Sequence, residues 1–420
     1  MTSPPVGGSS VSDWLSWQEK LHSSEIELGL ERVAHVAERM GVCRPAERII
    51  SVAGTNGKGS SVAFLASAMA SLGFSVATYT SPHLLRYNER IGIGGEPISD
   101  AALCRAFDAV EQAREGLALT YFEYGTLAAL WAFRQAKVDV AVLEVGLGGR
   151  LDAVNVVDAD AALVTSIALD HQEWLGGSRD AIGREKAGIF RAGRLAVCAD
   201  PDPPESIRRH AEEVGAVYLE RGMDFGVVVR STDWRYEGSQ RMLDHLPLPA
   251  LRAQIGNAAG CLALLDGLLG PELDHAGVVG ALSSMQVAGR QQVIGQRPLR
   301  LVDVSHNAAA GLVLADRLGT VSGRVHAVVG MLKDKDHGAY LEALTPVVNR
   351  WYPCTTSGSR GLLAEALAKR LPAEQVGGVY ASALAGWEAA LESASPADTI
   401  VGCGSFLTVA EILGAEQGIG

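Results

Sequence analysis

Short apolar runs, rich in β-branched residues, alternate along this chain with longer stretches whose apolar residues recur at helical spacing. In the first 200 residues the predicted strands are residues 48–53, 75–80, 138–145, 161–167 and 195–199. Continuous apolar strands separated by helices are typical of a parallel sheet with helices on both faces. We therefore expect an α/β fold for this part of the chain.

Three segments break the alternation. Residues 1–12 are rich in Pro, Gly and Ser and are expected to be disordered, whereas residues 14–40 carry apolar positions at helical spacing. The polar residues 223–249 are expected to form a small antiparallel excursion. After a predicted helix over residues 257–269, residues 289–298 have the composition of a linker.

The alternation restarts with predicted strands at residues 300–304, 325–331 and 399–402. A chain of 420 residues also exceeds the roughly 250–300 residues at which single cores stop growing. We therefore predict a central domain over residues 13–290 and a smaller, Rossmann-like α/β domain over residues 297–420.

Charge and composition exclude several classes of partner. The formal net charge is −12 and no basic run offsets it, which disfavours binding to nucleic acid. No apolar run approaches the ~20 residues that span a bilayer, and the first residues lack a secretory pattern. The six cysteines are far apart without metal-ligand spacing, so we predict free thiols. We also expect a cytoplasmic protein, and a monomer.

A glycine-rich loop follows the first predicted strand and precedes a predicted helix; its residues are Gly54, Thr55, Asn56, Gly57, Lys58, Gly59 and Ser60. Glycines let backbone amides approach phosphate oxygens, the helix N-terminus favours negative charge, and Lys58 can neutralise the terminal phosphates. The spacing differs from GxxxxGK[ST], because position 52 is Val and Gly59 separates Lys58 from Ser60. The sequence predicts a P-loop-type nucleotide site; the alternative is a turn with a solvated lysine.

Polar residues follow three of the predicted strands: Ser81, Glu144 and His171. Because the carboxyl ends of parallel strands share one edge of a sheet, we expect these residues to meet there. Hydroxyl, carboxylate and imidazole groups suit one or two magnesium ions that bridge phosphates. Taken singly, Glu144 could instead cap a strand, and His171 could be an ordinary polar residue. Glu185 and Lys186, in a predicted helix, could equally form a solvated face.

Nine segments of this chain closely resemble the bacterial folylpolyglutamate synthase and dihydrofolate synthase family, a relative of the Mur peptidoglycan ligases. They run in family order: GTNGKGS at 54–60, TSPHLLRYNERI at 80–91, TYFEYGTLAALW at 120–131, LEVGLGGRLDAVN at 143–155, TSIALDH at 165–171, IGREKAGIF at 182–190, VDVSHN at 302–307, GMLKDKD at 330–336 and GCGSF at 402–406.

The resemblance implies that ATP binds between two domains and that Lys58, Glu144, His171 and Lys186 are catalytic. It implies magnesium ligation by Ser60, Ser81, Glu144 and His171, and carbamylation of Lys186, which requires an unprotonated amine. On the adenine side it implies Asn257, Arg290, Asp303 and His306. The substrate is expected against the loop of residues 26–32 and against the strand ends. The residues expected to bind it are Ile26, Leu30, Arg32, Pro82, His83, Arg86, Phe122, Asp152, Ala153 and Asn155.

The resemblance also implies the reaction. A carboxylate of dihydropteroate or of a reduced folate would take the γ-phosphoryl group of ATP, and L-glutamate would then displace phosphate to form an amide. The segments at residues 23–33 and 120–131 most resemble the bifunctional proteobacterial enzymes of this family, so we expect both activities. The alternatives are a folylpolyglutamate synthase alone, a ligase of UDP-muramyl peptides, a dinucleotide-dependent dehydrogenase suggested by the glycines at 146–149, and a nucleotide switch without ligase chemistry.

Overall fold

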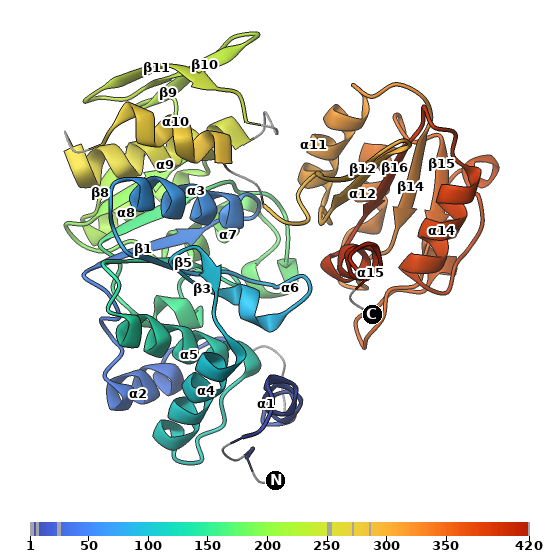
Figure 1. Ribbon diagram of the computed structural model, residues 1–420. Coiled ribbons are helices and arrows are strands. Elements are labelled where there is room, and N and C mark those ends of the chain that lie inside the picture. The colour runs from blue at the N-terminus through green and yellow to red at the C-terminus, as the bar shows by residue number, and fades with distance from the viewer. Residues whose placement is uncertain are drawn as a thin grey trace. The chain divides into compact units, whose positions relative to one another are not determined.

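The chain divides into two compact units (Figure 1). Unit 1 comprises residues 1–82 and 88–285, and unit 2 comprises residues 83–87 and 286–420. The structure, a computed structural model, describes residues 4–5, 8–22, 27–249, 254–270, 273–284 and 287–418. None of the helices in these described ranges combines the length and the apolar character needed to cross a bilayer.

Unit 1 is built on an eight-stranded sheet of order β4-β3-β2-β5-β1-β6-β7-β8. Its strands are β1 Arg48–Ala53, β2 Val76–Tyr79, β3 Ile91–Ile93, β4 Glu96–Pro97, β5 Val140–Glu144, β6 Ala161–Val164, β7 Leu195–Cys198 and β8 Val217–Glu220. Strands β2, β5, β1, β6, β7 and β8 are parallel, and β3 and β4 form an antiparallel edge. The predicted parallel sheet is confirmed, and its central strands are buried because helices cover both faces.

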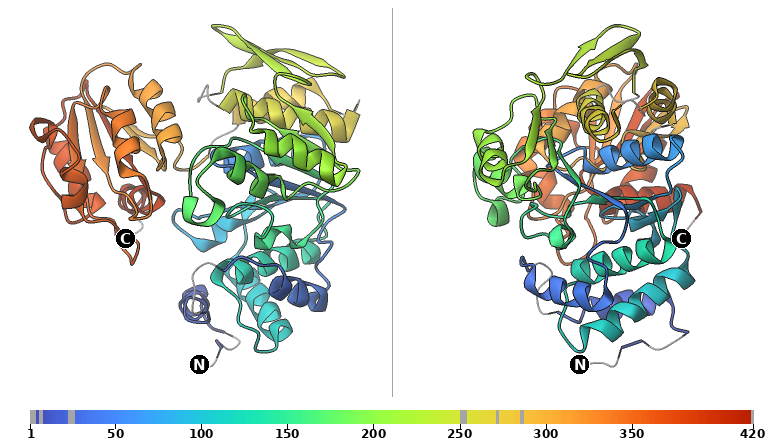
Figure 2. Two further views of the ribbon diagram at one scale, coloured as in Figure 1. Left: turned by 180° about the vertical axis from the view of Figure 1, so that it is seen from behind. Right: turned by 90° about the vertical axis from the view of Figure 1, so that its left-hand side faces the viewer.

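Helices cover the two faces of this sheet as separate layers. One layer contains α3 Lys58–Ser71, α9 Gln254–Leu269 and α10 His275–Ser284; the other contains α2 Glu31–Met40, α4 Asp100–Arg114 and α5 Tyr121–Ala136 (Figures 1 and 2). The remaining helices of unit 1 are α6 Gln172–Leu175, α7 Arg179–Ala187 and α8 Glu205–Val214, with 3-10 turns at Tyr87–Arg90 and Ala153–Val156. The first layer packs an apolar core onto the strands through residues such as Phe64, Leu65 and Leu262.

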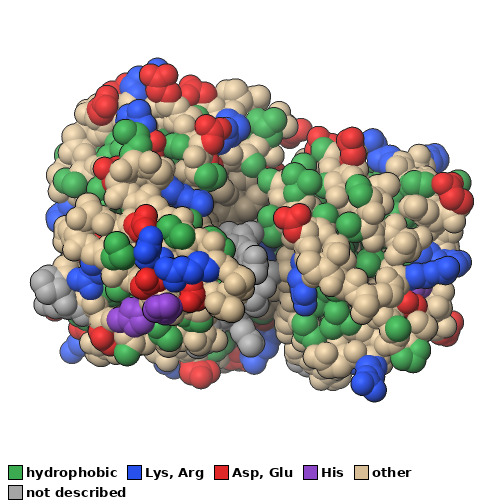
Figure 3. Space-filling model, turned by 90° about the horizontal axis from the view of Figure 1, so that it is seen from above, with side chains coloured by type: hydrophobic (Ala, Val, Ile, Leu, Met, Phe, Trp, Pro, Cys, Tyr) green, Lys and Arg blue, Asp and Glu red, His purple; other side chains and the backbone are tan. Residues whose placement is uncertain are grey.

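The expected antiparallel excursion is a three-stranded sheet of β9 Gly226–Val229, β10 Asp233–Glu237 and β11 Met242–Pro247. Its inner side is anchored by Trp234 and Tyr236, which are buried in the same core as α9. Ion pairs on the sheet join Arg230 to Asp233 and to Asp244. Charged side chains gather over this end of unit 1 in Figure 3.

At the N-terminus one expectation is wrong in part, and the expected helical structure is confirmed as two separate helices. Disorder was expected through residue 12, but helix α1 spans Val11–Gln18. Ser10 and Asp13 form a capping box at its N-terminus. Residues 14–40 also form parts of two helices, because α2 begins only at Glu31. Trp14 and Trp17 hold α1 in place by contacting Phe107 and Tyr124, respectively, on α4 and α5.

Unit 2 has a five-stranded sheet of order β12-β13-β16-β14-β15. Its strands are β12 Gln292–Gln296, β13 Leu299–Asp303, β14 Val325–Val329, β15 Arg350–Pro353 and β16 Thr399–Cys403, and its helices are α11 Ala308–Leu318, α12 His337–Leu344, α13 Ala364–Ala368, α14 Ala383–Ser393 and α15 Phe406–Glu416. A 3-10 turn lies at Ala373–Gln375. The expected linker over residues 289–298 is wrong in part, because β12 pairs antiparallel with β13.

Successive residues of the unit 2 strands face two separate cores. Ala327 and Val329 of β14 pack in one core with Leu314 and Tyr340 of α11 and α12. Val328 lies in the other core, which includes residues of α14 and α15. This alternation is that of a parallel strand buried on both faces. All six cysteines are free, and Cys198 and Cys403 are buried in strands as predicted.

Candidate active site

The glycine-rich loop joins β1 to α3, and its glycines are required by close contacts. Gly57 precedes α3 in the left-handed region, at φ 85°. A Cβ on Gly57 would lie 2.2 Å from Nδ2 of Asn257, and a Cβ on Gly54 would lie 1.8 Å from Oγ1 of Thr165. The structure therefore brings Asn257, predicted on the adenine side, against residues 54–60, the predicted phosphate loop.

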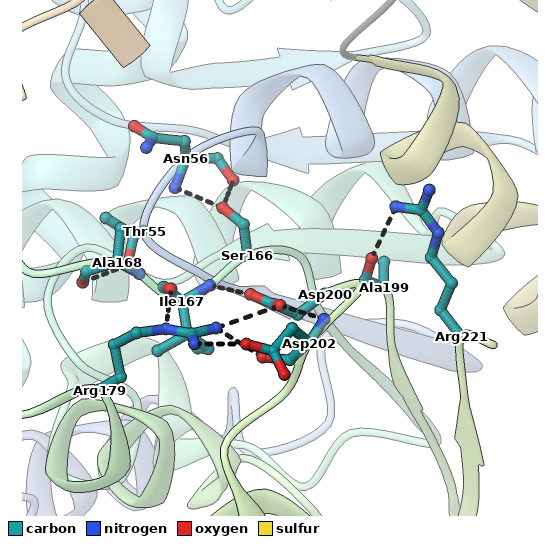
Figure 4. Close-up of polar contacts among 10 residues, drawn as sticks. All are labelled: Thr55, Asn56, Ser166, Ile167, Ala168, Arg179, Ala199, Asp200, Asp202 and Arg221. Carbon is teal, nitrogen blue, oxygen red and sulfur yellow. Dashed lines mark hydrogen bonds and ion pairs between the residues drawn. The ribbon is translucent and has the colours of Figure 1, made fainter. Parts of the chain in front are cut away.

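The tip of the loop is held by residues 165–168, which continue from the end of β6 (Figure 4). The amide of Thr55 donates to the carbonyl of Ser166 over 2.6 Å, and the amide of Asn56 donates to Oγ of Ser166 over 3.2 Å. The hydroxyl of Thr165 donates to the carbonyl of Asn56 over 2.7 Å. The hydroxyl of Thr55 bonds both the carbonyl and the amide of Ala168. The loop conformation is thus set by a neighbouring strand end.

Two lysines converge on one carbonyl oxygen of the loop. Nζ of Lys58, the first residue of α3, donates to the carbonyl of Gly54 over 3.0 Å and to that of Thr55 over 3.3 Å. Nζ of Lys186, near the end of α7, donates to the same Gly54 oxygen over 3.0 Å. Burial, and then the charge of Lys58, lower the pKa of Lys186 to about 7. The Lys186 amine is therefore largely unprotonated above neutral pH.

Glu144 lies at the end of β5, beside the start of α3. Its Oε2 accepts the backbone N–H of Ser81 over 3.3 Å, and a Cβ on Gly59 would lie 3.5 Å from the same oxygen. Ser60, buried in the first turn of α3, accepts a hydrogen bond from Nε2 of Gln254 over 3.3 Å. A buried carboxylate beside hydroxyl-bearing residues at a phosphate loop suits a hard divalent cation.

His171 precedes α6 with a left-handed backbone, at φ 51°. Its amide donates to Oδ1 of Asp170 over 2.9 Å, and about a third of its side chain is exposed. Within the described ranges, no three His, Cys, Asp or Glu side chains form a ready-made metal cage. A magnesium ion would therefore need phosphate or water oxygens as well, as is usual for Mg²⁺ at nucleotide sites. Ligation by His171 stays a prediction.

Asp152 and Phe122, both predicted to contact the substrate, lie at the loop that follows β5, Asp152 within it and Phe122 on α5 beside it. Asp152 is buried, and its carboxylate accepts the amides of Leu147 over 2.8 Å and Val154 over 3.0 Å. Burial raises the pKa of Asp152 to about 6. Phe122 packs on the same loop, since a Cβ on Gly146 would lie 2.5 Å from its ring.

The neighbours of Asp152 are tied to α7. Ala153 is buried in the 3-10 turn Ala153–Val156. The side-chain amide of Asn155 donates to the carbonyls of Arg150 and Gly188, and its oxygen accepts from Arg191 over 2.9 Å. These bonds join the turn to the end of the helix that carries Lys186. Contact of Asn155 with substrate stays a prediction.

The other predicted substrate residues are spread over several segments. Ile26 lies outside the described residues, and Leu30 precedes α2. Arg32 donates to Oε1 of Glu123 over 3.0 Å, which links α2 to the start of α5 beside Phe122. Pro82 is exposed in unit 1. His83 and Arg86 belong to unit 2, where the His83 ring lies 5.6 Å from that of Tyr87.

Three predicted adenine-side residues cluster within unit 2. The Arg290 guanidinium lies 5.8 Å from the ring centre of Phe406, and the His306 ring lies 6.2 Å from it. Asp303 is buried and accepts the amides of Gln291 over 2.9 Å and Ser305 over 2.7 Å. Sequence reasoning did not single out Phe406, although it ends the GCGSF segment.

Residues that shape unit 1 around the loop were also missed, namely Thr165, Ser166, Gln254, Arg179 and Asp200. Thr165 and Ser166 lie in the TSIALDH segment, so that segment held a usable signal. Arg179 and Asp200 have no local motif around them.

The chain is similar to known proteins over nearly its whole length. Residues 52–224 match the Mur ligase middle domain, and residues 289–406 match the glutamate ligase domain of Mur ligases. The dihydrofolate synthase/folylpolyglutamate synthase of Escherichia coli K12 is 44% identical over 411 residues, covering 97% of this chain and 96% of the relative.

Two solved structures are similar over nearly the whole chain. FolC of E. coli in complex with DHPP and ADP has a TM-score of 0.95 and 44% identity, covering 99% of each chain. A bifunctional folylpolyglutamate synthase/dihydrofolate synthase with Mn, AMPPNP and L-glutamate bound has a TM-score of 0.93 and 43% identity, covering 99% of this chain and 100% of that one.

Proposed function

Because the chain belongs to the dihydrofolate synthase/folylpolyglutamate synthase family of Mur-type ligases, we propose that it joins L-glutamate to two acceptors at the expense of ATP. The first acceptor is dihydropteroate, which becomes dihydrofolate, and the second is the γ-carboxylate of a reduced folate. The observation that best supports the proposal is the phosphate loop, where Lys58 and Lys186 meet at Gly54 beside Glu144. Relatives of this shape bind ADP, AMPPNP and L-glutamate.

The proposed reaction has two steps. A carboxylate oxygen of the acceptor attacks the γ-phosphorus of ATP, the bond to the β-γ bridging oxygen breaks, and ADP leaves. The resulting acyl phosphate then reacts with the uncharged amine of L-glutamate, which forms the amide and releases phosphate and a proton. Phosphorylation is needed because a carboxylate and an amine otherwise form only a salt.

The loop amides and Lys58 would hold the terminal phosphates of ATP and stabilise the charge that spreads over the transferring group. Nζ of Lys58 donates to the carbonyls of Gly54 and Thr55, so it lies against the loop that would bind these phosphates. A magnesium ion held by Glu144, Ser60, Ser81 and His171 would neutralise further phosphate charge. Asn257, Arg290, Asp303 and His306 are assigned to the adenine side, and the remaining predicted residues to the acceptor.

We also assign carbamylation to Lys186. Its side chain is 5% exposed and its pKa is lowered to about 7, so an unprotonated amine is present to react with carbon dioxide. The product is an anion beside Lys58, which removes the repulsion between two ammonium groups. Protein prepared with ¹³C-bicarbonate should give a carbamate signal in the NMR spectrum that Lys186→Arg lacks; an identical spectrum for both proteins would reject the assignment.

The site needs residues of one chain only, so we propose a monomer, and the six free thiols suit the reducing cytoplasm. Light scattering after gel filtration tests the first point. A mass near 44.1 kDa is expected, and a stable dimer mass would contradict it.

A two-acceptor assay tests the activity. Purified protein receives ATP, magnesium and L-glutamate with dihydropteroate in one arm and tetrahydrofolate in the other. Release of ADP that depends on glutamate is expected in both arms. Activity with tetrahydrofolate alone would restrict the enzyme to polyglutamylation. Activity with neither acceptor, or only with a UDP-muramyl peptide, would overturn the proposal.

A further inference from the structure

Residues 165–168 hold the phosphate loop but belong to no helix or strand. Their contacts fix Thr55 and Asn56, whose amides donate to Ser166. The position of the loop therefore depends on whatever fixes these four residues. The segment bonds the backbone of Ala53 and of Thr55 through Thr165 and Ser166, so the backbone groups of Ile167 depend on other partners.

The backbone of one residue in the segment, Ile167, is held on both sides (Figure 4). The amide of Ile167 donates to Oδ2 of Asp200 over 2.6 Å, and its carbonyl accepts from Nε of Arg179 over 2.9 Å. Arg179 and Asp200 also form an ion pair, in which Nη2 of Arg179 lies 3.3 Å from Oδ1 of Asp200. Arg179, Asp200 and the backbone of Ile167 thus form a closed ring of interactions next to Thr55 and Asn56.

Burial makes Asp200 the rigid member of this ring. It is 3% exposed, and its Oδ1 also accepts the amide of Asp202 over 2.9 Å. The carboxylate therefore has two backbone donors and one cation, which together compensate its removal from water. Asp202 also pairs with Arg179, over 2.9 Å, but its side chain is 88% exposed. Two aspartates thus contact one arginine, and only Asp200 reaches Ile167.

The same arginine begins the helix that carries Lys186. Arg179 is the first residue of α7, and Lys186 is near the end of that helix, where it reaches the carbonyl of Gly54. The ring therefore joins the start of this helix to the segment that carries the loop. Arg179 and Asp200 thus contact both the segment that holds the loop and the start of the helix from which Lys186 reaches Gly54.

We propose that Asp200 and Arg179 are positioning residues for ATP, acting on Thr55 and Asn56 through the backbone of Ile167. The inference rests on the proposed function, since it assumes that the loop binds the phosphates of ATP. Neither residue contacts the reacting atoms. Their effect is preorganisation, and a loop displaced by about 1 Å can cost about 100-fold in rate.

The test compares Asp200→Asn with Asp202→Asn. Both changes remove one carboxylate charge beside Arg179, but only the first loosens Ile167. Asp200→Asn should raise KM for ATP by about 10- to 100-fold and leave KM for L-glutamate within about twofold. Asp202→Asn should change neither by more than about twofold, because exposed ion pairs contribute little. Equal KM values for ATP in the two variants would overturn the inference.

A second readout is independent of catalysis. Hydrogen exchange followed by mass spectrometry should show faster exchange in a peptide covering residues 54–60 for Asp200→Asn, and wild-type exchange there for Asp202→Asn. If the wild type fails to bind Mg-AMPPNP, the proposed function is wrong. The exchange rate of residues 54–60 still tests whether Asp200 positions the loop, because it does not depend on nucleotide binding. Unchanged loop exchange in a folded Asp200→Asn protein would overturn that role.

Arg179 provides a variant pair in case Asp200→Asn does not fold. Its side chain is 39% exposed, so Arg179→Ala should be tolerated. Arg179→Lys keeps the charge but cannot reach Ile167 and Asp200 together. KM for ATP should rise in the order wild type, Arg179→Lys, Arg179→Ala. Two variants that lose thermal stability while keeping the wild-type KM for ATP would show a purely structural role.

Discussion

The side-chain amines of Lys58 and Lys186 both donate to the carbonyl oxygen of Gly54, each over 3.0 Å. One lysine comes from the helix that follows the phosphate loop, and the other comes from α7. Two ammonium groups at one acceptor repel each other, and the buried Lys186 has the lowered pKa. Above neutral pH the arrangement therefore leaves Lys186 largely uncharged, which agrees with the different roles proposed for the two lysines.

Removing the cation tests the phosphate-binding role. We expect Lys58→Ala to lower kcat/KM for ATP by about 100- to 1000-fold, the usual effect of losing one charge-stabilising donor. The fold should remain, because Lys58 begins α3 and its partners are two carbonyls of the loop. Steady-state kinetics and circular dichroism check both points, with the exposed Lys20→Ala as control. Wild-type turnover by a folded Lys58→Ala protein would contradict the assignment.

Lys186 predicts a pH dependence of stability. The folded pKa of about 7 is below the ordinary value of 10.5, because burial and Lys58 disfavour the charged form. Between these values the unfolded chain binds more protons, so stability rises with pH, and the full cost of burial is present below about pH 7.

Denaturant unfolding in buffers free of carbon dioxide measures this effect against Lys186→Met. The free energy of unfolding of the wild type relative to the variant should rise by roughly 1.4 kcal/mol per pH unit, or somewhat less, between about pH 8 and 10. A difference that stays constant with pH would mean that Lys186 is charged in the folded protein.

The left-handed glycine at the start of α3 gives a steric prediction. In Gly57→Ala the new Cβ meets Nδ2 of Asn257 at 2.2 Å, in addition to backbone strain at φ 85°. We expect the affinity for Mg-AMPPNP to fall by about tenfold or more, which calorimetry measures. Gly73→Ala is the matched control at the other end of the helix. Its φ is 90°, but nothing lies within 4 Å of the added Cβ, so nucleotide affinity should not change.

Asp152 offers a different test, because its two carboxylate oxygens each accept a backbone amide. Asparagine has one acceptor oxygen, so Asp152→Asn leaves the amide of Leu147 or Val154 facing an NH₂ group. The cost should be about 1–3 kcal/mol of stability at pH 5, where the wild-type carboxyl, with a pKa of about 6, is mostly neutral. Thermal unfolding checks it, with the exposed Asp158→Asn as control. A stability loss equal to that of the control would show that these bonds contribute little.

The sequence predicted elements best where one element is buried on both faces. Strand β1 spans Arg48–Ala53 as predicted, because a continuous apolar run has few other places in a fold. Strand β12 was taken for a linker because it is a half-exposed, glutamine-containing edge strand whose order comes from pairing with β13. Strand β8 was missed because its first residue, Val217, is exposed and its last is a glutamate. Such strands depend on partners that local patterns do not reveal.

The same limit applies to the candidate site. The phosphate loop is contiguous, so its residues and its place between a strand and a helix could be predicted directly. Lys186 and Gly54 are 132 residues apart, and only the family resemblance pointed to that lysine. The ring of Arg179, Ile167 and Asp200 has neither a motif nor a fixed spacing, and it becomes visible only when three segments fold together.

The acyl phosphate is tested most directly by isotope transfer. Dihydropteroate labelled with ¹⁸O in its carboxylate is converted with ATP, magnesium and L-glutamate, and the released phosphate is examined by mass spectrometry. The account predicts one ¹⁸O atom in each phosphate, because the carboxylate oxygen that attacks the γ-phosphorus leaves with it. Unlabelled phosphate, or label found in AMP, would contradict the proposed chemistry at the phosphate loop.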